Sequence, residues 1–160
     1  MTTNGRRNKN AGHSWERQVV DMLKEIGFPN AVTTRSESRG RDAQKIDVMN
    51  KDEGKNGRLP YNIQAKTLSK PTAYPKLLSE LPQDGSEINV VFHKQTQKDP
   101  KTGRFMPRGT YAITNLKDFI QMMKKIEQFK IVFKLLTDNI DYIPDEERPE
   151  VEKQLKKIGL

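Results

Sequence analysis

The feature that most constrains the fold is a run of consecutive apolar residues, INVVFHK, at residues 88–94. Consecutive rather than alternating apolar side chains predict a strand that is buried on both faces. A further strand pattern, TYAIT, follows at residues 110–114 across a basic connector. Because a strand that is covered on both sides needs other elements above and below it, this segment predicts a layered α/β fold.

Helical and strand patterns fill the rest of the chain. Residues 14–28 (SWERQVVDMLKEIGF) predict a helix that is capped by Ser14 and ends near Gly27. Its apolar residues recur at the spacing of one buried stripe, at Trp15, Val19, Met22 and Ile26. Strand patterns are expected at residues 31–35, 44–50 and 61–68, a short helix at 75–81 and a long helix at 115–136.

These elements predict one folded domain. Residues 1–12 carry no apolar period and are expected to form a flexible basic arm. Residues 13–137 form the domain, and residues 138–160 are a charged tail that we expect to be helical. The order helix, three strands, helix, two strands, helix predicts a central mixed sheet flanked by helices.

Composition narrows the possible functions. The formal net charge of +8 over 160 residues favours a polyanionic partner, because Lys and Arg release counterions from phosphates. The chain has no cysteine, which excludes disulfides and thiolate zinc sites, and only two histidines. A metal would therefore have oxygen ligands, which favours Mg²⁺ or Mn²⁺. No apolar run approaches the ~20 residues that span a bilayer, so we expect a cytoplasmic protein without a membrane partner.

Two acidic residues lie where acids are unexpected. At about 100° per residue, Glu16 projects on the apolar side of its helix, where burial is costly unless the carboxylate meets a cation or metal. A rim position paired with Arg17 or a lysine is the simpler interpretation. Asp47 falls within the strand pattern 44–50, although aspartate is depleted in strands. An acid at this position indicates either that the protein needs the carboxylate there or that this face of the strand is exposed to solvent.

The next strand adds polar groups that can meet Asp47. Gln64 and Lys66 are two residues apart, so their side chains share one strand face. If the two strands pair as a hairpin, Asp47 can lie on that face too. A metal held by carboxylates polarises a phosphate and activates a bound water, and a lysine stabilises the developing negative charge. The carbonyl of Ala65 is a possible further ligand. This arrangement suits phosphodiester hydrolysis.

A helical glutamate, an aspartate at a strand and (D/E)xK on the next strand resemble the signature of the PD-(D/E)xK nuclease superfamily. The matching segments are SWERQVVDMLKEIGF, KIDVMN, YNIQAK, INVVFHK and YAITNLKDFIQMM, which together cover roughly residues 12–125. Within the superfamily the chain looks most like the archaeal-type and phage-type Holliday junction resolvases. The resemblance implies a restriction-endonuclease-like αβββαβ core, Mg²⁺ or Mn²⁺ as cofactor, a four-way DNA junction as substrate, a homodimer, and a phage-infected or prokaryotic cell.

The resemblance also assigns roles to residues. Glu16, Asp47 and Gln64 become metal-site residues and Lys66 the catalytic lysine. A serine in the loop before Asp47 approaches the active site in the resolvases, and Ser38 is preferred over Ser36. Gln64 departs from the usual acid, although superfamily members with glutamine at this place exist. No proline precedes Asp47, and Asp42 is either an additional ligand or a loop residue.

Basic loops flank these residues. We expect DNA contacts from six residues: Arg35, Arg39, Arg41, Lys45, Lys101 and Arg104. Solvated charged loops explain the same pattern about equally well. Phe105 and Met106 are candidates for a wedge at a branch point, although core packing or a dimer contact explains them as well. Met122 and its apolar neighbours indicate a core or dimer stripe.

The leading hypothesis is a metal-dependent, structure-selective endodeoxyribonuclease. The alternatives are another DNA endonuclease of the same superfamily, such as a restriction-like or repair enzyme, and a non-catalytic nucleic-acid-binding protein in which Gln64 marks a decayed site. A basic structural protein would explain the charge but not the two acids.

Overall fold

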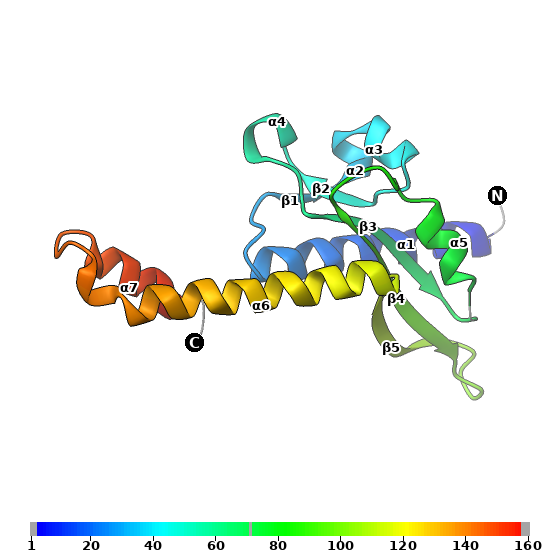
Figure 1. Cartoon of the computed structure of the whole chain (residues 1–160). Coiled ribbons are helices and arrows are strands. Elements are labelled where there is room, and N and C mark those ends of the chain that lie inside the picture. The colour runs from blue at the N-terminus through cyan, green and yellow to red at the C-terminus, as the bar shows by residue number, and fades with distance from the viewer. Residues whose placement is uncertain (1–2, 71, 158–160) are drawn as a thin grey trace. The chain divides into compact units, whose positions relative to one another are not determined.

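The computed structural model describes residues 3–70 and 72–157, which fold as two compact units, Met1–Asp118 and Phe119–Leu160 (Figure 1). The first unit holds an α/β fold with a five-stranded sheet. The expected domain ran to residue 137, but the division falls at Asp118, because the long helix α6 (Leu116–Asp138) buries none of its side chains.

The first helix, α1, spans Thr3–Glu25 and is much longer than predicted. The flexible arm expected over residues 1–12 is helical from Thr3 onward, and residues 1–2 lie outside the described residues. Because no proline interrupts this polar stretch, the helix continues through it and Ser14 is internal rather than an N-cap. The predicted end near Gly27 is confirmed. Gly27 has φ 106°, and the Phe28 N–H closes the helix on the Leu23 carbonyl.

The buried face of α1 is rotated from the predicted stripe. Trp15 and Val19 are buried as expected, but Met22 and Ile26 are 42% and 71% exposed. Val20 and Leu23 take their places in the core. The rotation brings the helix face that carries Glu16 toward the sheet, because residues 16, 20 and 23 lie on one side of a helix.

The sheet has the order β1-β2-β3-β4-β5, with β3 and β4 parallel and the other neighbours antiparallel. The strands are β1 Ala31–Thr33, β2 Val48–Asn50, β3 Tyr61–Leu68, β4 Ile88–Lys98 and β5 Phe105–Ile113. The predicted pairing of the strands around Asp47 and Gln64 is confirmed, since β2 and β3 are antiparallel neighbours. The central mixed sheet that the sequence predicts is therefore present.

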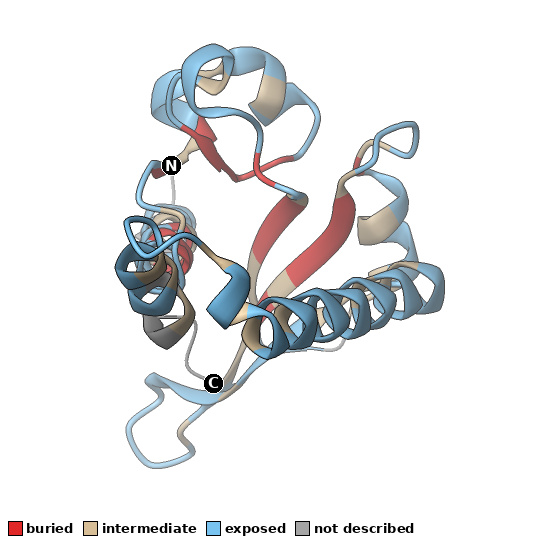
Figure 2. Ribbon diagram, turned by 60° about the vertical axis from the view of Figure 1, so that its left-hand side comes forward, coloured by how far each residue is buried: buried red, intermediate tan, exposed pale blue. Residues whose placement is uncertain are grey.

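Helix α1 packs across β1, β2 and β3, and the hydrophobic core lies between them (Figures 1 and 2). On β3, Ile63 and Ala65 face this core. The alternate residues point to the opposite face of the sheet, where Gln64 is nevertheless buried at 1% exposure. His93 on β4 is buried too. The sheet thus has an apolar side under α1 and a buried polar side.

Short helices occupy three connectors. The segment before β2, expected to be a polar loop or strand edge, forms α2 (Thr34–Glu37) and α3 (Arg39–Ala43). Helix α4 (Glu53–Asn56) lies between β2 and β3, and α5 (Tyr74–Ser79) is the short helix predicted near Pro75.

The hairpin of β4 and β5 is longer than the apolar pattern predicted. The strands reach Lys98 and start again at Phe105, so Phe105 and Met106 are exposed strand residues rather than loop residues. Backbone hydrogen bonds extend the ladder beyond the buried part, which a search for apolar residues does not detect.

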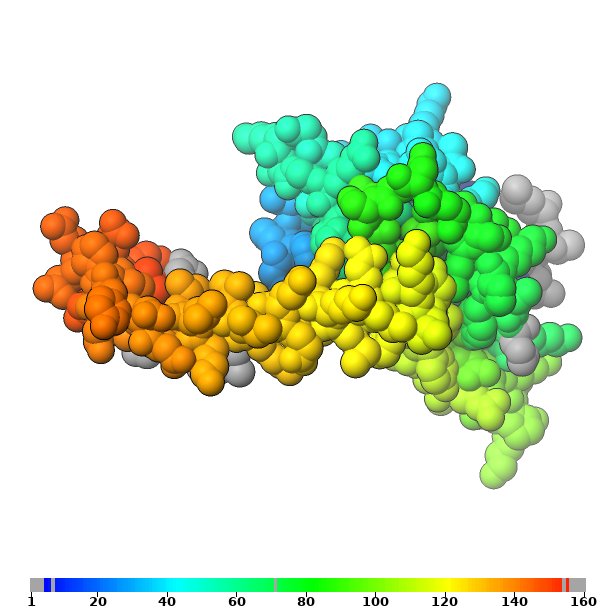
Figure 3. All heavy atoms as spheres, viewed as in Figure 1, coloured from blue at the N-terminus to red at the C-terminus, as the bar shows by residue number. Residues whose placement is uncertain are grey.

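Helix α6 opens in the first unit and continues into the second, where it is followed by a 3₁₀ turn (Ile140–Tyr142) and α7 (Arg148–Lys157). The predicted tail helix is confirmed over the span of α7. Apolar side chains of α6 are exposed, among them Phe119, Ile126 and Leu135. Figure 3 shows atoms of this helix, in yellow to orange, at the surface. Among the described residues, no helix combines the length and apolar character needed to cross a membrane.

Candidate active site

Asp47 lies one residue before β2, not within the strand, but it is fixed to β3 at two points. Its N–H donates to the Ile63 carbonyl at 2.8 Å, and its Oδ2 accepts from the Ala65 N–H at 2.7 Å. Gln64 lies between these two anchor residues, so the acid and the amide are held at the same stretch of β3. Asp47 is only 8% exposed.

The groups around Asp47 shift the pKa of its carboxyl group. Burial raises the pKa of Asp47 above its ordinary value, and the nearby Glu16 carboxylate adds to the rise. The Ala65 hydrogen bond, the Lys66 ammonium and the Arg35 guanidinium act in the opposite direction. Glu16 and Lys66, from α1 and β3, therefore both lie within electrostatic range of Asp47. The structure brings these predicted site residues together.

Glu16 is buried at 4% exposure and has a cationic partner. Arg35 donates from Nη2 to Oε1 at 2.9 Å and from Nε to Oε2 at 3.1 Å, which occupies both carboxylate oxygens. Such a forked pair is a strong charge-assisted interaction. The simpler sequence interpretation, an ion pair, holds for Glu16, although the partner is neither Arg17 nor a lysine.

Thr34 explains how Arg35 reaches Glu16. The Thr34 side chain is fully buried, and its hydroxyl donates to the Ile46 carbonyl at 2.7 Å. The Thr34 N–H donates to the Asp47 carbonyl at 3.1 Å. The start of α2 is thereby fastened to the segment that carries Asp47, and the next residue, Arg35, extends over the acids. Sequence reasoning missed this role of Arg35, because nothing in the spacing of residues 16 and 35 indicates a contact.

Gln64 carries the most informative atom of the site. Its side chain is 1% exposed, and within the described part of the chain Oε1 is buried without a hydrogen-bond donor. A buried carbonyl oxygen without a donor costs roughly 1–3 kcal/mol. A cation that this oxygen coordinates would remove that cost.

No protein-family model matches this chain, and neither a curated protein nor a solved structure gives a significant match.

The two serine candidates have structural roles. Ser38 accepts a hydrogen bond from the Arg41 N–H at 3.3 Å and caps α3. Ser36 donates to the Thr33 carbonyl at 3.2 Å. Neither serine hydrogen-bonds a side chain of the candidate site, and Asp42 is an exposed residue of α3. The expected approach of a serine to Asp47 stays a prediction.

The predicted DNA-contacting residues divide into two groups. Arg35 and Arg41 are engaged inside the protein, because Arg41 donates to Glu53 Oε2 from Nε at 3.0 Å and from Nη2 at 2.7 Å. The other four are exposed and join no ion pair among the described residues: Arg39, Lys45, Lys101 and Arg104. Only this second group has its charge available to an external phosphate.

The donor set determines which metal the site suits. Carboxylate and amide oxygens of Glu16, Asp47 and Gln64 are hard ligands, as Mg²⁺ and Mn²⁺ prefer. No group of three His, Cys, Asp or Glu residues that could hold a metal ion occurs in the described chain, so a metal site at Asp47 would need a donor of another kind, for which the Gln64 amide is the candidate. The Gln64 oxygen that lacks a donor fits this role. Ala65 contributes its N–H to Asp47; its carbonyl remains a predicted ligand.

Proposed function

We propose that this protein is a metal-dependent endodeoxyribonuclease that cleaves phosphodiesters at four-way DNA junctions. The observation that carries the proposal is the buried Gln64 Oε1, which has no hydrogen-bond donor among the described residues and lies on the stretch of β3 to which Asp47 is fastened. The order of acid, acid, amide and lysine along the chain gives the resemblance to the PD-(D/E)xK superfamily. The αβββαβ core of that superfamily is part of the same proposal.

Each residue has a defined task in this mechanism. Mg²⁺ held by the oxygens of Asp47 and Gln64 would supply Lewis-acid chemistry, that is, polarisation of a phosphate and a lowered pKa of a water. Asp47 and Gln64 supply oxygens, and the Ala65 N–H keeps the Asp47 carboxylate oriented. The Lys66 ammonium orients the attacking water and stabilises negative charge that develops on the phosphate. Exposed Arg39 and Lys45 hold the flanking phosphates.

Arg35 adds a step that the sequence did not predict. Both Glu16 oxygens are taken by its guanidinium, so Glu16 becomes a metal ligand only when Arg35 moves away. Because the Arg35 side chain is 44% exposed, it can turn toward a DNA phosphate, and a bound cation would then balance the buried Glu16 charge that it leaves behind. Arg35 then contributes to phosphate binding while Glu16 becomes available.

A homodimer belongs to the proposal because two nicks are needed to resolve a junction. Helix α6 supports it. Apolar side chains follow a heptad spacing on its surface, at Met122, Ile126, Phe129, Phe133 and Leu136, and none of the residues of α6 is buried. A seam of this kind is typical of helices that pair with another helix.

Cleavage of a synthetic four-way junction tests the proposal. With Mg²⁺, we expect symmetrically paired nicks in two opposing strands of the same polarity, and Asp47→Asn or Lys66→Ala should abolish them. Asp42→Asn is the matched control, since it removes an exposed acid outside the site and should leave cleavage intact. Equal cleavage of linear duplex would favour another DNA endonuclease. Binding without cleavage in any divalent ion would instead favour a non-catalytic DNA-binding protein.

A further inference from the structure

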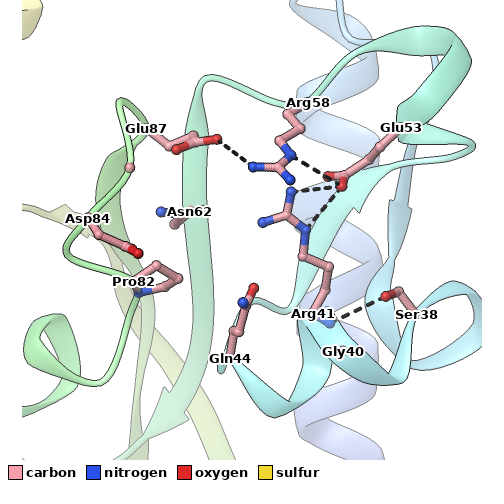
Figure 4. A pocket seen from close by; sticks show the side chains of 11 residues that line it. Ser38, Gly40, Arg41, Gln44, Glu53, Arg58, Asn62, Pro82, Asp84 and Glu87 are labelled. Atoms are coloured by element: carbon pink, nitrogen blue, oxygen red, sulfur yellow. Dashed lines mark hydrogen bonds and ion pairs between the residues drawn. The ribbon is translucent and has the colours of Figure 1, made fainter.

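A cavity with a volume of about 440 Å³ opens near the candidate site. Its walls come from α3 and α4 on one side and from the connector before β4, residues 82–87, on the other (Figure 4). Asn62 at the start of β3 also lines it. Asn62 is two residues before Gln64, so about 7 Å of strand separates this cavity from the candidate metal site.

The cavity rests on a rigid support. Asn62 Nδ2 donates to Asn89 Oδ1 at 3.0 Å, and Asn89 Nδ2 donates to the Pro82 carbonyl at 2.8 Å. Both asparagines are buried. This chain of amides links β3, β4 and the 82–87 connector, so the 82–87 wall is held in place before any ligand arrives, which lowers the entropic cost of binding.

The charges of the cavity do not suit a phosphate. Arg41 and Arg58 face three acids, Glu53, Asp84 and Glu87, which gives a local charge of −1 in a chain of charge +8. Arg41 is bound to Glu53, and Arg58 lies 3.9 Å from Glu53 and 3.8 Å from Glu87. The arginine charges are thus already balanced, and a neutral ligand with polar edges fits better than an anion.

Three polar groups in the cavity have no hydrogen-bond partner among the described residues. Within the described residues, no hydrogen bond engages the side chain of Gln44, the carboxylate of Asp84 or Nη1 of Arg41. Gln44 and Asp84 point into the cavity from its two walls (Figure 4). One wall therefore offers hydrogen-bond acceptors, and the other offers guanidinium and amide donors.

We propose that this cavity binds an unstacked guanine base next to the scissile phosphate. Guanine carries two adjacent donors, N1–H and N2–H, that a single carboxylate such as Asp84 can accept together. Its other edge carries the acceptors O6 and N7, which arginine recognises. Cytosine and adenine each offer only one exocyclic amino donor, and thymine offers only its N3–H. The base is neutral, as the charge balance requires.

The inference rests on the proposed function for its biological setting. Taking a base out of its stack costs least where pairing is already interrupted, as at a branch point. A guanine held beside Asn62 would place its neighbouring phosphate toward Gln64 and Lys66. The cavity would then select the position of the cut, a property that the metal site alone does not supply.

Nucleotide titrations of the full chain without metal test the inference by NMR. We expect dGMP to shift backbone amides of residues 41–44 and 82–87, and to bind more tightly than dAMP, dCMP or TMP. Asp84→Asn should weaken dGMP binding by about tenfold or more, because one carboxylate accepts two base donors. Asp21→Asn, which removes an exposed acid from α1, is the matched control and should bind dGMP as the wild type does.

Equal binding of all four nucleotides, shifts reproduced by inorganic phosphate alone, or no shifts in these segments would overturn the inference. The Asp47→Asn variant separates this result from the proposed function, since it should lose cleavage and keep dGMP binding. If the protein binds dGMP through Asp84 but cuts no DNA, the cavity assignment stands and the nuclease proposal fails.

Discussion

Replacing Arg35 by glutamine tests how strongly its guanidinium stabilises the buried Glu16 carboxylate. The substitution removes two charge-assisted hydrogen bonds, of 2.9 and 3.1 Å, from a Glu16 side chain that is 5% exposed. Breaking a fully buried ion pair costs about 3–5 kcal/mol. Because the Arg35 side chain is 44% exposed, solvent already screens part of the interaction. We therefore expect the free energy of unfolding to fall by about 1–3 kcal/mol.

A double-mutant cycle isolates the pair. Urea unfolding in EDTA is measured for the wild type, Glu16→Gln, Arg35→Gln and the double variant, and we expect a coupling free energy of about 1–2 kcal/mol. Arg39→Gln is the control, since Arg39 is exposed and joins no ion pair in the described chain, and its effect should stay within about 0.5 kcal/mol. A coupling energy near zero would refute the inference that Arg35 stabilises the buried Glu16 carboxylate.

The same variants report on metal binding. If Mn²⁺ and the guanidinium compete for Glu16, excess Mn²⁺ should stabilise Arg35→Gln more than the wild type, because the metal no longer displaces a partner. Equal Mn²⁺ stabilisation of both proteins would mean that Glu16 is not a ligand and serves only to position Arg35.

Three further predictions concern single residues. Burial raises the pKa of Asp47, so above that pKa the charged carboxylate lowers the free energy of unfolding. As the pH falls through the pKa of Asp47 in the folded protein toward the ordinary value of 3.8, the carboxylate takes up a proton and this destabilisation is lost. Asp47→Asn should therefore have the higher Tm at neutral pH, with the difference from wild type shrinking on acidification, and junction cleavage by the wild type should decline over the same range. Gln64→Glu adds a charged ligand and should tighten Mn²⁺ binding in calorimetry while lowering the Tm in EDTA; unchanged affinity would count against Gln64 as a ligand. Phe129→Glu in α6 should convert a dimer to a monomer in sedimentation, and an unchanged mass would show that this seam is not the interface.

The sequence predicted which helices and strands form better than it predicted where they begin and end. Strand β3 was expected at its observed bounds, because apolar and polar residues alternate along it and turn-forming residues flank it on both sides. The β4–β5 hairpin was underestimated, since its outer part is held by backbone hydrogen bonds and leaves no apolar pattern. The start of α1 was missed for a related reason. Its first turns are polar and solvated, and periodicity detects only helices with a buried face.

The candidate site could be predicted only in part. Strand alternation placed Gln64 and Lys66 on one face, and hairpin pairing brought Asp47 to them, because both rules are local. The contact of Arg35 with Glu16 depends on Thr34 fastening α2 to the Asp47 segment, which is a tertiary event without a sequence period. The Ser38 expectation came from resemblance alone, and the structure uses Ser38 to cap α3 instead.

The central claim is that Asp47 and Gln64 hold a divalent metal. Anomalous diffraction from a crystal of the full chain soaked with Mn²⁺ tests it directly. We expect one Mn²⁺ peak within coordination distance of Gln64 Oε1 and the Asp47 carboxylate, with Arg35 turned away from Glu16. Saturating Mn²⁺ with no peak at these oxygens, and Gln64 Oε1 still without a partner, would contradict the account.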